Sequence, residues 1–309
     1  MNRALLLISH FLIFSSFSLN TNAQKLSSSL SSKEDTLKLL GSKIVNAEFA
    51  EQRFRADSHF TRVLVRALQL PYSFNYAFDS LGMISRLYSP DSSFRIFTWQ
   101  VSKDENVYRR HGAIQMNTND GSLKLFPLID RSNLIVNQKD TVSNNEWWIG
   151  SIYYKILKNQ YNNQCYYTLL GYDEYSRNST RKRIEILYFN DQQKPVFGAP
   201  LFVFNQDSKN STVQSRFWLE YKKNVAVSIK YDDDLKMIVY DHLISETNEK
   251  ERPETYIPDG DYEGFKWLNG KWVHMEKPFN FTLEDGQAPI EKPVLESKFP
   301  VRKTNKKGN

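Results

Sequence analysis

The sequence predicts a mainly β protein built from antiparallel meander sheets, with a helical segment at its N-terminal end. Three observations predict this class. Short runs rich in Ile, Val, Tyr, Phe and Trp alternate with turn clusters between residues 71 and 277. Residues 33–70 instead carry apolar side chains at mostly three- and four-residue steps. The turn clusters are short enough to join neighbouring strands as hairpins, which favours antiparallel pairing.

Residues 1–23 have the composition of a secretory signal peptide. Arg3 is the only charged residue there, an apolar run extends from Ala4 to Phe17, and a polar patch ends at Ala23. The apolar run is too short for a helix that spans a bilayer. We therefore expect cleavage after Ala23, export to the periplasm or the cell exterior, and no transmembrane segment in the mature protein.

The next two segments are predicted to differ in order. Residues 24–32 are rich in serine and predict a flexible leader. Residues 33–70 predict one or two helices that end before Pro71, because the residue before a proline disfavours helix. The apolar positions that carry the helical period in the second part of this segment are Phe49, Phe54, Phe60, Val63, Leu64, Ala67 and Leu68.

The β-rich domain, residues 71–277, is expected to hold about a dozen short strands. They fall into three loose groups of four, which leaves three architectures open: a sandwich, an irregular barrel, or an incomplete propeller-like arrangement. A closed propeller needs about four to eight blades, so three groups are too few. Length alone is compatible with one β domain on which the helices pack.

Adjacent aromatic residues indicate that both faces of the predicted sheets matter. Neighbours in a strand point to opposite faces, so each pair places one ring on either side. Such rings fill a core or line an open groove where sugar rings stack, and core packing is the favoured interpretation. The pairs are Trp147-Trp148, Tyr153-Tyr154 and Tyr166-Tyr167.

The formal net charge of +6 does not predict nucleic-acid binding. Five basic residues and no acidic residue lie from Lys298 to the C-terminus. When these and Arg3 are set aside, basic and acidic residues are equal in number. The charge therefore predicts an irregular basic tail over residues 278–309 rather than a basic folded surface.

The best candidate for a metal site is the stretch Asp259-Gly260-Asp261-Tyr262-Glu263. Asp259, Asp261 and Glu263 alternate along it and could present oxygen atoms to calcium, the only cofactor that the sequence raises. The favoured alternative is a Pro-Asp-Gly turn with positive φ at Gly260, leading to a hairpin at Asn269-Gly270.

Motifs for catalysis are missing from the sequence. It holds no G-x-S-x-G, P-loop, H-E-x-x-H or C-x-x-C motif, and its only cysteine, Cys165, excludes an internal disulfide. His242 follows Asp241, but alternation along a strand separates these two side chains. No catalytic residue is assigned, and the sequence inclines against an enzyme.

Several stretches together resemble a family of exported Bacteroidota proteins that has no assigned activity. They are SLGMISRLYSPDSSFRIFTW, WWIGSIYYKIL, YYTLLGYDEYSRNSTRKRIEIL, PVFGAPLF and YDDDLKMIVYDHL with IPDGDYEGF. The resemblance extends from about Phe74 to Trp272. It implies export and carries no activity, ligand or site residue with it.

These observations predict a binding or assembly protein of the cell envelope, whose partner is an envelope protein or a glycan. The alternative is a hydrolase of glycans or peptidoglycan with carboxylates that only the fold brings together. Two acids in one cleft, roughly 5 to 10 Å apart and beside a tryptophan, would favour the hydrolase. A flat, uncharged aromatic patch would favour a partner surface.

Overall fold

The computed structural model describes residues 3–104, 107–205 and 211–279, with side chains from residue 24 onward. One compact unit extends to Pro278. Nearly all of the predicted basic tail, 278–309, lies outside the described residues, and so do the side chains of the predicted signal segment.

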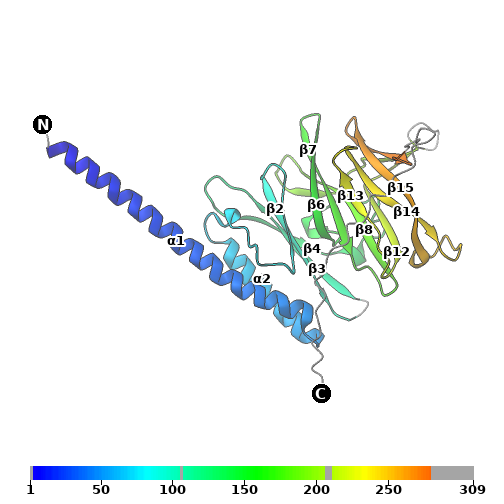
Figure 1. Cartoon of the computed structure of the whole chain (residues 1–309), viewed down its shortest axis with the longest axis horizontal. Helices are drawn as coiled ribbons and strands as arrows, with labels where there is room; N and C mark the ends of the chain where they lie inside the picture. Colours follow the sequence, from blue (N-terminus) through cyan, green and yellow to red (C-terminus); the bar gives the residue numbers. More distant parts are fainter. Residues whose placement is uncertain (1–2, 105–106, 206–210, 280–309) are drawn as a thin grey trace, which may run out of the picture. The chain divides into compact units, whose positions relative to one another are not determined.

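Two long helices form the N-terminal part, as the sequence predicts (Figure 1). α1 spans Arg3–Asn46 and α2 spans Ala50–Leu68. The apolar face of α2 is buried from Ala56 to Leu68 at the predicted spacing, whereas Phe49 precedes the helix and is 60% exposed. The ring of Phe60 lies edge-on to Trp99 with centroids 5.3 Å apart. A single strongly apolar face therefore attaches α2 to the sheet beneath it.

The predicted flexible leader, residues 24–32, is helical in the structure and belongs to α1. Serine-rich composition favours coil, but Leu26, Leu30, Leu37 and Ile44 continue one apolar stripe along the helix. Leu30 is 3% exposed and lies in the same core cluster as α2. Packing of this stripe overrides the weak helix propensity of the serines.

The strands form three sheets within the described residues, and none of the three closes into a barrel. The first sheet is a meander of four strands: β1 (Ser85–Tyr88), β2 (Phe94–Ser102), β3 (Tyr108–Met116) and β4 (Lys124–Ile129). The second has the order β5 (Ser143–Asn144), β9 (Pro195–Phe197), β8 (Ser179–Phe189), β7 (Gln164–Asp173) and β6 (Ile152–Tyr161), with β12 (Arg216–Lys222) also paired to β8.

The third sheet is β11 (Thr212–Gln214), β10 (Phe202–Phe204), β16 (Lys271–Glu276), β15 (Tyr256–Leu268), β14 (Met237–Ser245) and β13 (Ile229–Asp232). Its β10–β16 pair is parallel, and all other pairs of named strands are antiparallel. Short 3-10 helices cover Ser73–Asn75 (η1), Ser132–Leu134 (η2), Asn145–Trp147 (η3) and Pro253–Thr255 (η4). The run PVFGAPLFVF is divided between β9 in the second sheet and β10 in the third.

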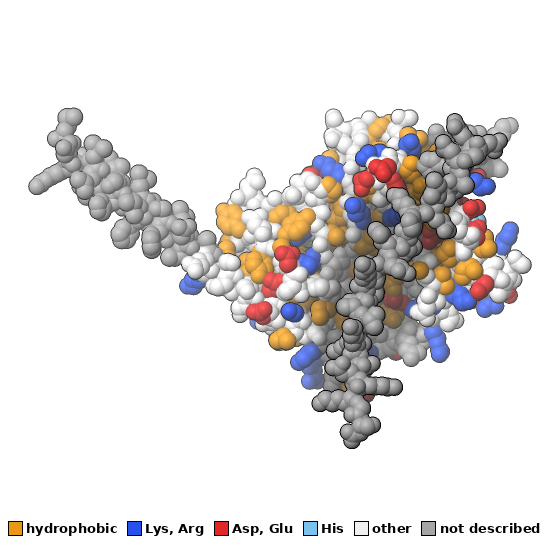
Figure 2. All heavy atoms as spheres, in the orientation of Figure 1, with side chains coloured by type: hydrophobic (Ala, Val, Ile, Leu, Met, Phe, Trp, Pro, Cys, Tyr) orange, Lys and Arg blue, Asp and Glu red, His pale blue; other side chains and the backbone are white. Residues whose placement is uncertain are grey.

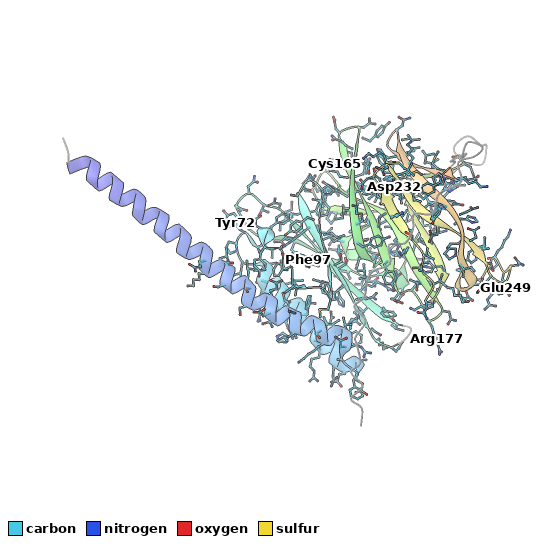
Figure 3. The ribbon with its side chains drawn as sticks, in the orientation of Figure 1. Tyr72, Phe97, Cys165, Arg177, Asp232 and Glu249 are labelled. Carbon is cyan, nitrogen blue, oxygen red and sulfur yellow. The ribbon has the colours of Figure 1, made fainter. Side chains whose placement is uncertain are left out.

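The three sheets are stacked face to face, with the helices on the outer face of the first. On β2, Phe97 packs in the cluster that contains the helices (Figure 3), whereas Ile96 packs against the second sheet. On β7, Leu169 faces the first sheet and Leu170 faces the third. Because side chains alternate along each strand, the first and second sheets both pack apolar residues on their two faces. This explains the long apolar runs in their strands.

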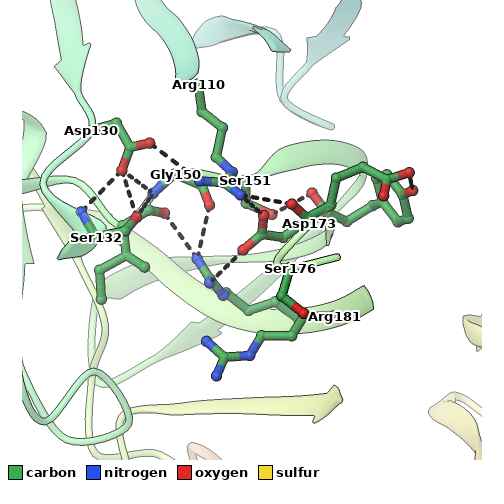
Figure 4. Close-up of polar contacts among 12 residues, drawn as sticks. Arg110, Asp130, Ser132, Gly150, Ser151, Asp173, Ser176 and Arg181 are labelled. Atoms are coloured by element: carbon green, nitrogen blue, oxygen red, sulfur yellow. Dashed lines mark hydrogen bonds and ion pairs between the residues drawn. The ribbon is translucent and has the colours of Figure 1, made fainter. Parts of the chain in front are cut away.

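The first two sheets are also joined by a buried charged network (Figure 4). Arg110 on β3 pairs with Asp173 on β7 and lies 3.6 Å from Asp130. Arg183 on β8 lies 3.7 Å from Asp173 and donates to the Ile149 carbonyl at 2.9 Å. Two arginines here balance two aspartates, so the network carries no net charge and holds the sheets in register.

Candidate functional site

A groove of about 720 Å³ lies at the edge of the second sheet. It lies where η3, β5, β9 and the loop before β5 meet. We call it the Trp147 groove. It is lined by Phe126, Ile135, Thr141–Trp147, Asn190 and Lys194–Val196.

The two tryptophans of the predicted aromatic pair divide between groove and core. Trp147 is 49% exposed, whereas Trp148 is fully buried. Asn144 caps η3, because its Oδ1 accepts hydrogen bonds from the backbone N–H groups of Glu146 and Trp147 at 2.9 and 3.0 Å. The Trp148 backbone N–H donates to the Ile129 carbonyl at 3.1 Å. The exposed indole is therefore carried on a fixed backbone.

Three amide side chains line the groove, and each uses one end to hold backbone. Nδ2 of Asn145 donates to the Pro127 carbonyl at 3.0 Å, and Oδ1 of Asn190 accepts from the N–H groups of Gln192 and Lys194 at 3.0 Å each. No described residue forms a hydrogen bond with the remaining amide atoms, which are Oδ1 of Asn145, Nδ2 of Asn190 and Nδ2 of Asn144. The groove thus offers donors and acceptors to a ligand.

The charges that line the groove balance. Glu146 is its one acidic residue and Lys194 its one basic residue, among the described residues that line it. Both side chains are exposed. A site with this lining favours a ligand without net charge.

A chain of buried polar groups runs beneath the groove. Nε1 of Trp148 donates to the Tyr153 hydroxyl at 2.8 Å, and that hydroxyl donates to Oε1 of Glu185 at 2.5 Å. The other carboxylate oxygen of Glu185 accepts from Nε of Arg216 at 2.8 Å. Burial, together with the charge of Glu185, raises the pKa of Tyr153 well above its ordinary value. Tyr153 therefore stays neutral and remains a donor.

Arg216 then holds the opposite wall of the groove. Its Nη1 donates to the carbonyls of Gln138, at 3.1 Å, and Thr141, and its Nη2 donates to Oγ of Ser143 at 3.0 Å. Gly198, with φ +85°, leaves room for this guanidinium, because a Cβ there would lie 2.8 Å from Nη1. One buried chain thus connects the Trp148 side of the groove to the segment that leads into β5.

The residues predicted for calcium lie inside β15 and not on a turn between strands. The pairing of β14 with β15 shifts register between Asp241 and Leu243, which makes a bulge around Gly260. Gly260 has the expected positive φ, +95°. The positive φ at Gly260 was predicted correctly, but the predicted Pro-Asp-Gly turn is wrong, because these residues form a bulge inside one continuous strand.

The structure brings Asp259 and Glu263 to the same histidine, whereas Asp261 is exposed. Nδ1 of His242 lies 2.8 Å from Oδ2 of Asp259, and its Nε2 lies 3.7 Å from Oε1 of Glu263. Nε2 of His274 is 2.9 Å from Oε2 of Glu263. The hydrogen bond from His274 holds the pKa of Glu263 below its ordinary value.

No three acidic, histidine or cysteine side chains converge as a metal site within the described parts of the chain. The prediction that alternation separates the side chains of His242 and Asp241 is correct. The sequence could not reveal the partners of His242 on the next strand, because the bulge that directs Asp259 toward His242 is a property of the paired strands.

A smaller pocket of about 380 Å³ is lined by the residue types that the hydrolase alternative names, two glutamates and a tryptophan. Glu220, Glu263 and Trp218 all line it. Nε of Arg181 donates to Oε2 of Glu220 at 2.8 Å, and Oγ of Ser179 donates to its Oε1 at 2.7 Å. A glycosidase needs one carboxyl that keeps its proton for the leaving group. Both oxygens of Glu220 are engaged by Arg181 and Ser179, and the lowered pKa of Glu263 does not favour a retained proton there.

Comparisons with protein-family models, curated proteins and solved structures found no match to this chain. Among the described residues, no helix combines the length and the apolar character needed to cross a bilayer. The functional argument therefore rests on the sequence and on the geometry of the groove.

Proposed function

We propose that this chain is an exported saccharide-binding protein and that the Trp147 groove is its binding site. The observation that carries the proposal is an exposed indole beside amides that have unused hydrogen-bonding atoms. A pyranose ring presents an apolar C–H face that packs on an aromatic ring, and its hydroxyls require both donors and acceptors. Trp147 supplies the first surface, and Asn144, Asn145 and Asn190 supply the second.

The lining of the groove favours binding over hydrolysis. Glycoside hydrolysis uses two carboxyl groups, roughly 5 to 10 Å apart. Glu146 is the one carboxylate among the described lining residues, and it is balanced by Lys194. This arrangement supports retention of an unmodified, uncharged saccharide.

The buried polar chain supports the same proposal through rigidity. A preformed site loses less conformational entropy on binding than a site that must be ordered by its ligand. Arg216 and Glu185 are both completely buried. Through Ser143 and Tyr153 they fix both walls before any ligand arrives.

A glycan array tests the proposal with the chain from residue 24 onward and two variants. We expect the unchanged protein to bind neutral oligosaccharides, and Trp147→Ala to lose about tenfold or more in affinity, which corresponds to ~1.4 kcal/mol. Tyr161→Ala is the matched control, because this aromatic residue is 41% exposed on the β6–β7 hairpin and does not line the groove. Absence of saccharide binding, or equal binding by Trp147→Ala, would reject the proposal.

A further inference from the structure

Lys139 is half-buried, and its side-chain ammonium makes no hydrogen bond or ion pair with a described residue. Its Nζ lies 5.1 Å from the centroid of the Trp218 ring, and Cζ of Arg181 lies 4.9 Å from the same centroid. Burial, with the neighbouring charge of Arg181, lowers the pKa of Lys139. An ammonium group in this position gains strongly from an anionic partner.

The same residue lines the 380 Å³ pocket described above, and two further nitrogen-bearing side chains line it with Lys139. Lys250 lies before η4, and His242 lies on β14. Lys250, like Lys139, has no acidic partner among the described residues. The two lysines bring positive charge to this pocket from two separate parts of the chain.

The acids that line the pocket form no ion pair with Lys139 or Lys250 among the described residues and contact other groups instead. Glu220 is paired with Arg181 at 2.8 Å, and Glu263 is paired with His274 at 2.9 Å. Asp241 accepts a hydrogen bond from the Ser228 N–H at 2.7 Å. Lys139 and Lys250 therefore have no carboxylate of the described residues as a direct partner, and their ammonium groups are available to an oxyanion.

The backbone at Lys139 is also fixed. Its carbonyl accepts hydrogen bonds from the backbone N–H groups of Ser215 and Arg216 at 3.0 and 2.9 Å. Lys139 therefore lies beside the start of β12, the strand that carries Trp218. The ammonium is thus carried on a segment that two hydrogen bonds anchor to the second sheet.

We propose that this pocket is a second binding site, which takes a small molecule carrying a carboxylate or a phosphate group and holds that oxyanion at Lys139. Ammonium–oxyanion hydrogen bonds are strong when both partners leave water. Tyr256 and Phe217 also line the pocket and provide apolar surface for the rest of the ligand. This site is separate from the Trp147 groove and does not depend on the saccharide proposal.

Isothermal titration at low ionic strength tests the site with two probes, inorganic phosphate and glucuronate. We expect one-site binding of at least one probe, which identifies whether phosphate or carboxylate is preferred. Lys139→Gln should weaken binding at least tenfold, and Lys139→Arg, which keeps the charge, should restore most of it. Lys266→Gln is the matched control, because Lys266 is an exposed residue of β15 outside the pocket.

Two results would overturn the proposal: no binding of either probe to the unchanged protein, or unchanged binding by Lys139→Gln. Trp147→Ala should bind the anion normally. Thermal unfolding of Lys139→Gln near the temperature of the unchanged protein shows that a loss of binding is not a loss of fold. Failure of anion binding and failure of saccharide binding are thereby distinguishable.

Discussion

Arg216 and Glu185 face each other directly across β12 and β8, and Nε of the arginine lies 2.8 Å from Oε2 of the glutamate. Neither side chain is exposed. Removing two charges from water is costly, so a buried pair of this kind is weak evidence for stability. Here the guanidinium also binds the segment that forms one wall of the Trp147 groove. We therefore interpret the pair as a device that positions the groove.

Arg216→Met should destabilise the protein by about 3–5 kcal/mol, because Glu185 would remain as an uncompensated buried charge. Urea unfolding at neutral pH measures the loss. The double variant Arg216→Met with Glu185→Leu should recover much of the stability. It should not recover saccharide binding, because Thr141 and Ser143 still lack their donor. Recovery of both properties together would show that the pair does not position the groove.

Glu263→Gln should reduce the loss of stability that the protein undergoes as the pH falls from neutral to acidic values. The folded pKa of Glu263 lies below its unfolded value, so its ionised form contributes stability above the unfolded pKa. That contribution is lost as the pH falls through the folded pKa, below the ordinary value of 4.5. Denaturant unfolding between pH 7 and pH 3 should show a smaller decrease for the variant than for the unchanged protein. The exposed Asp261→Asn should behave like the unchanged protein, and an identical curve for Glu263→Gln would count against the His274 contact.

Calcium should not stabilise the folded protein. Asp259 and Glu263 are directed at His242, and Glu263 also binds His274, so their oxygens do not surround a common point. Thermal unfolding in calcium and in a chelator should give the same midpoint. A midpoint that rises with calcium, and no longer does so in Asp259→Asn, would restore the calcium interpretation.

Asp57→Ala should loosen the contact between α2 and the first sheet. Asp57 is 4% exposed, and its two oxygens lie 2.7 Å from Nε1 of Trp99 and 3.2 Å from Nε2 of His111. Removing this acceptor leaves the buried Nε1 of Trp99 without a hydrogen-bond partner, which costs about 1–3 kcal/mol. Chemical unfolding measures the loss, and Asp57→Asn, which keeps an acceptor, should lose less.

The control for this measurement is Glu51→Ala, which removes an exposed pair with Arg55 on the same helix. Exposed pairs contribute at most about 1 kcal/mol, so this variant should remain near the unchanged protein. If Asp57→Ala and Glu51→Ala lost the same small amount of stability, the buried contact would have no special role.

Local chemistry in the sequence predicted those features that depend on a few neighbouring residues. The Asn269-Gly270 hairpin has positive φ at both residues, 48° and 80°, as its dipeptide requires. Tyr166 and Tyr167 pack in different core clusters and Tyr153 is fully buried beside the 39% exposed Tyr154, as alternation predicts. Trp147 and Trp148 were expected in a strand but lie at the end of η3, so alternation does not explain how they divide. In Figure 2, acidic and basic side chains are interspersed over the visible face, in keeping with the balanced charge outside the tail.

The features that the sequence did not reveal depend on how distant strands pair. Arg216 meets Glu185 because β12 returns to β8 after the chain has passed through β9, β10 and β11. No local pattern records that return. The Trp147 groove forms between segments that this pairing brings together, so the sequence supplied its exposed aromatic residue but not the surrounding amides.

Iodide quenching of tryptophan fluorescence tests the groove proposal most directly, when it is measured during addition of an oligosaccharide that binds the protein on the glycan array. Trp147 is exposed, whereas Trp99, Trp148 and Trp272 are buried, so iodide should quench Trp147 most strongly. We predict that a saturating oligosaccharide protects this signal, and that Trp147→Ala lacks both the quenchable component and the protection. Unchanged quenching of the unaltered protein at saturating ligand would contradict binding at the groove.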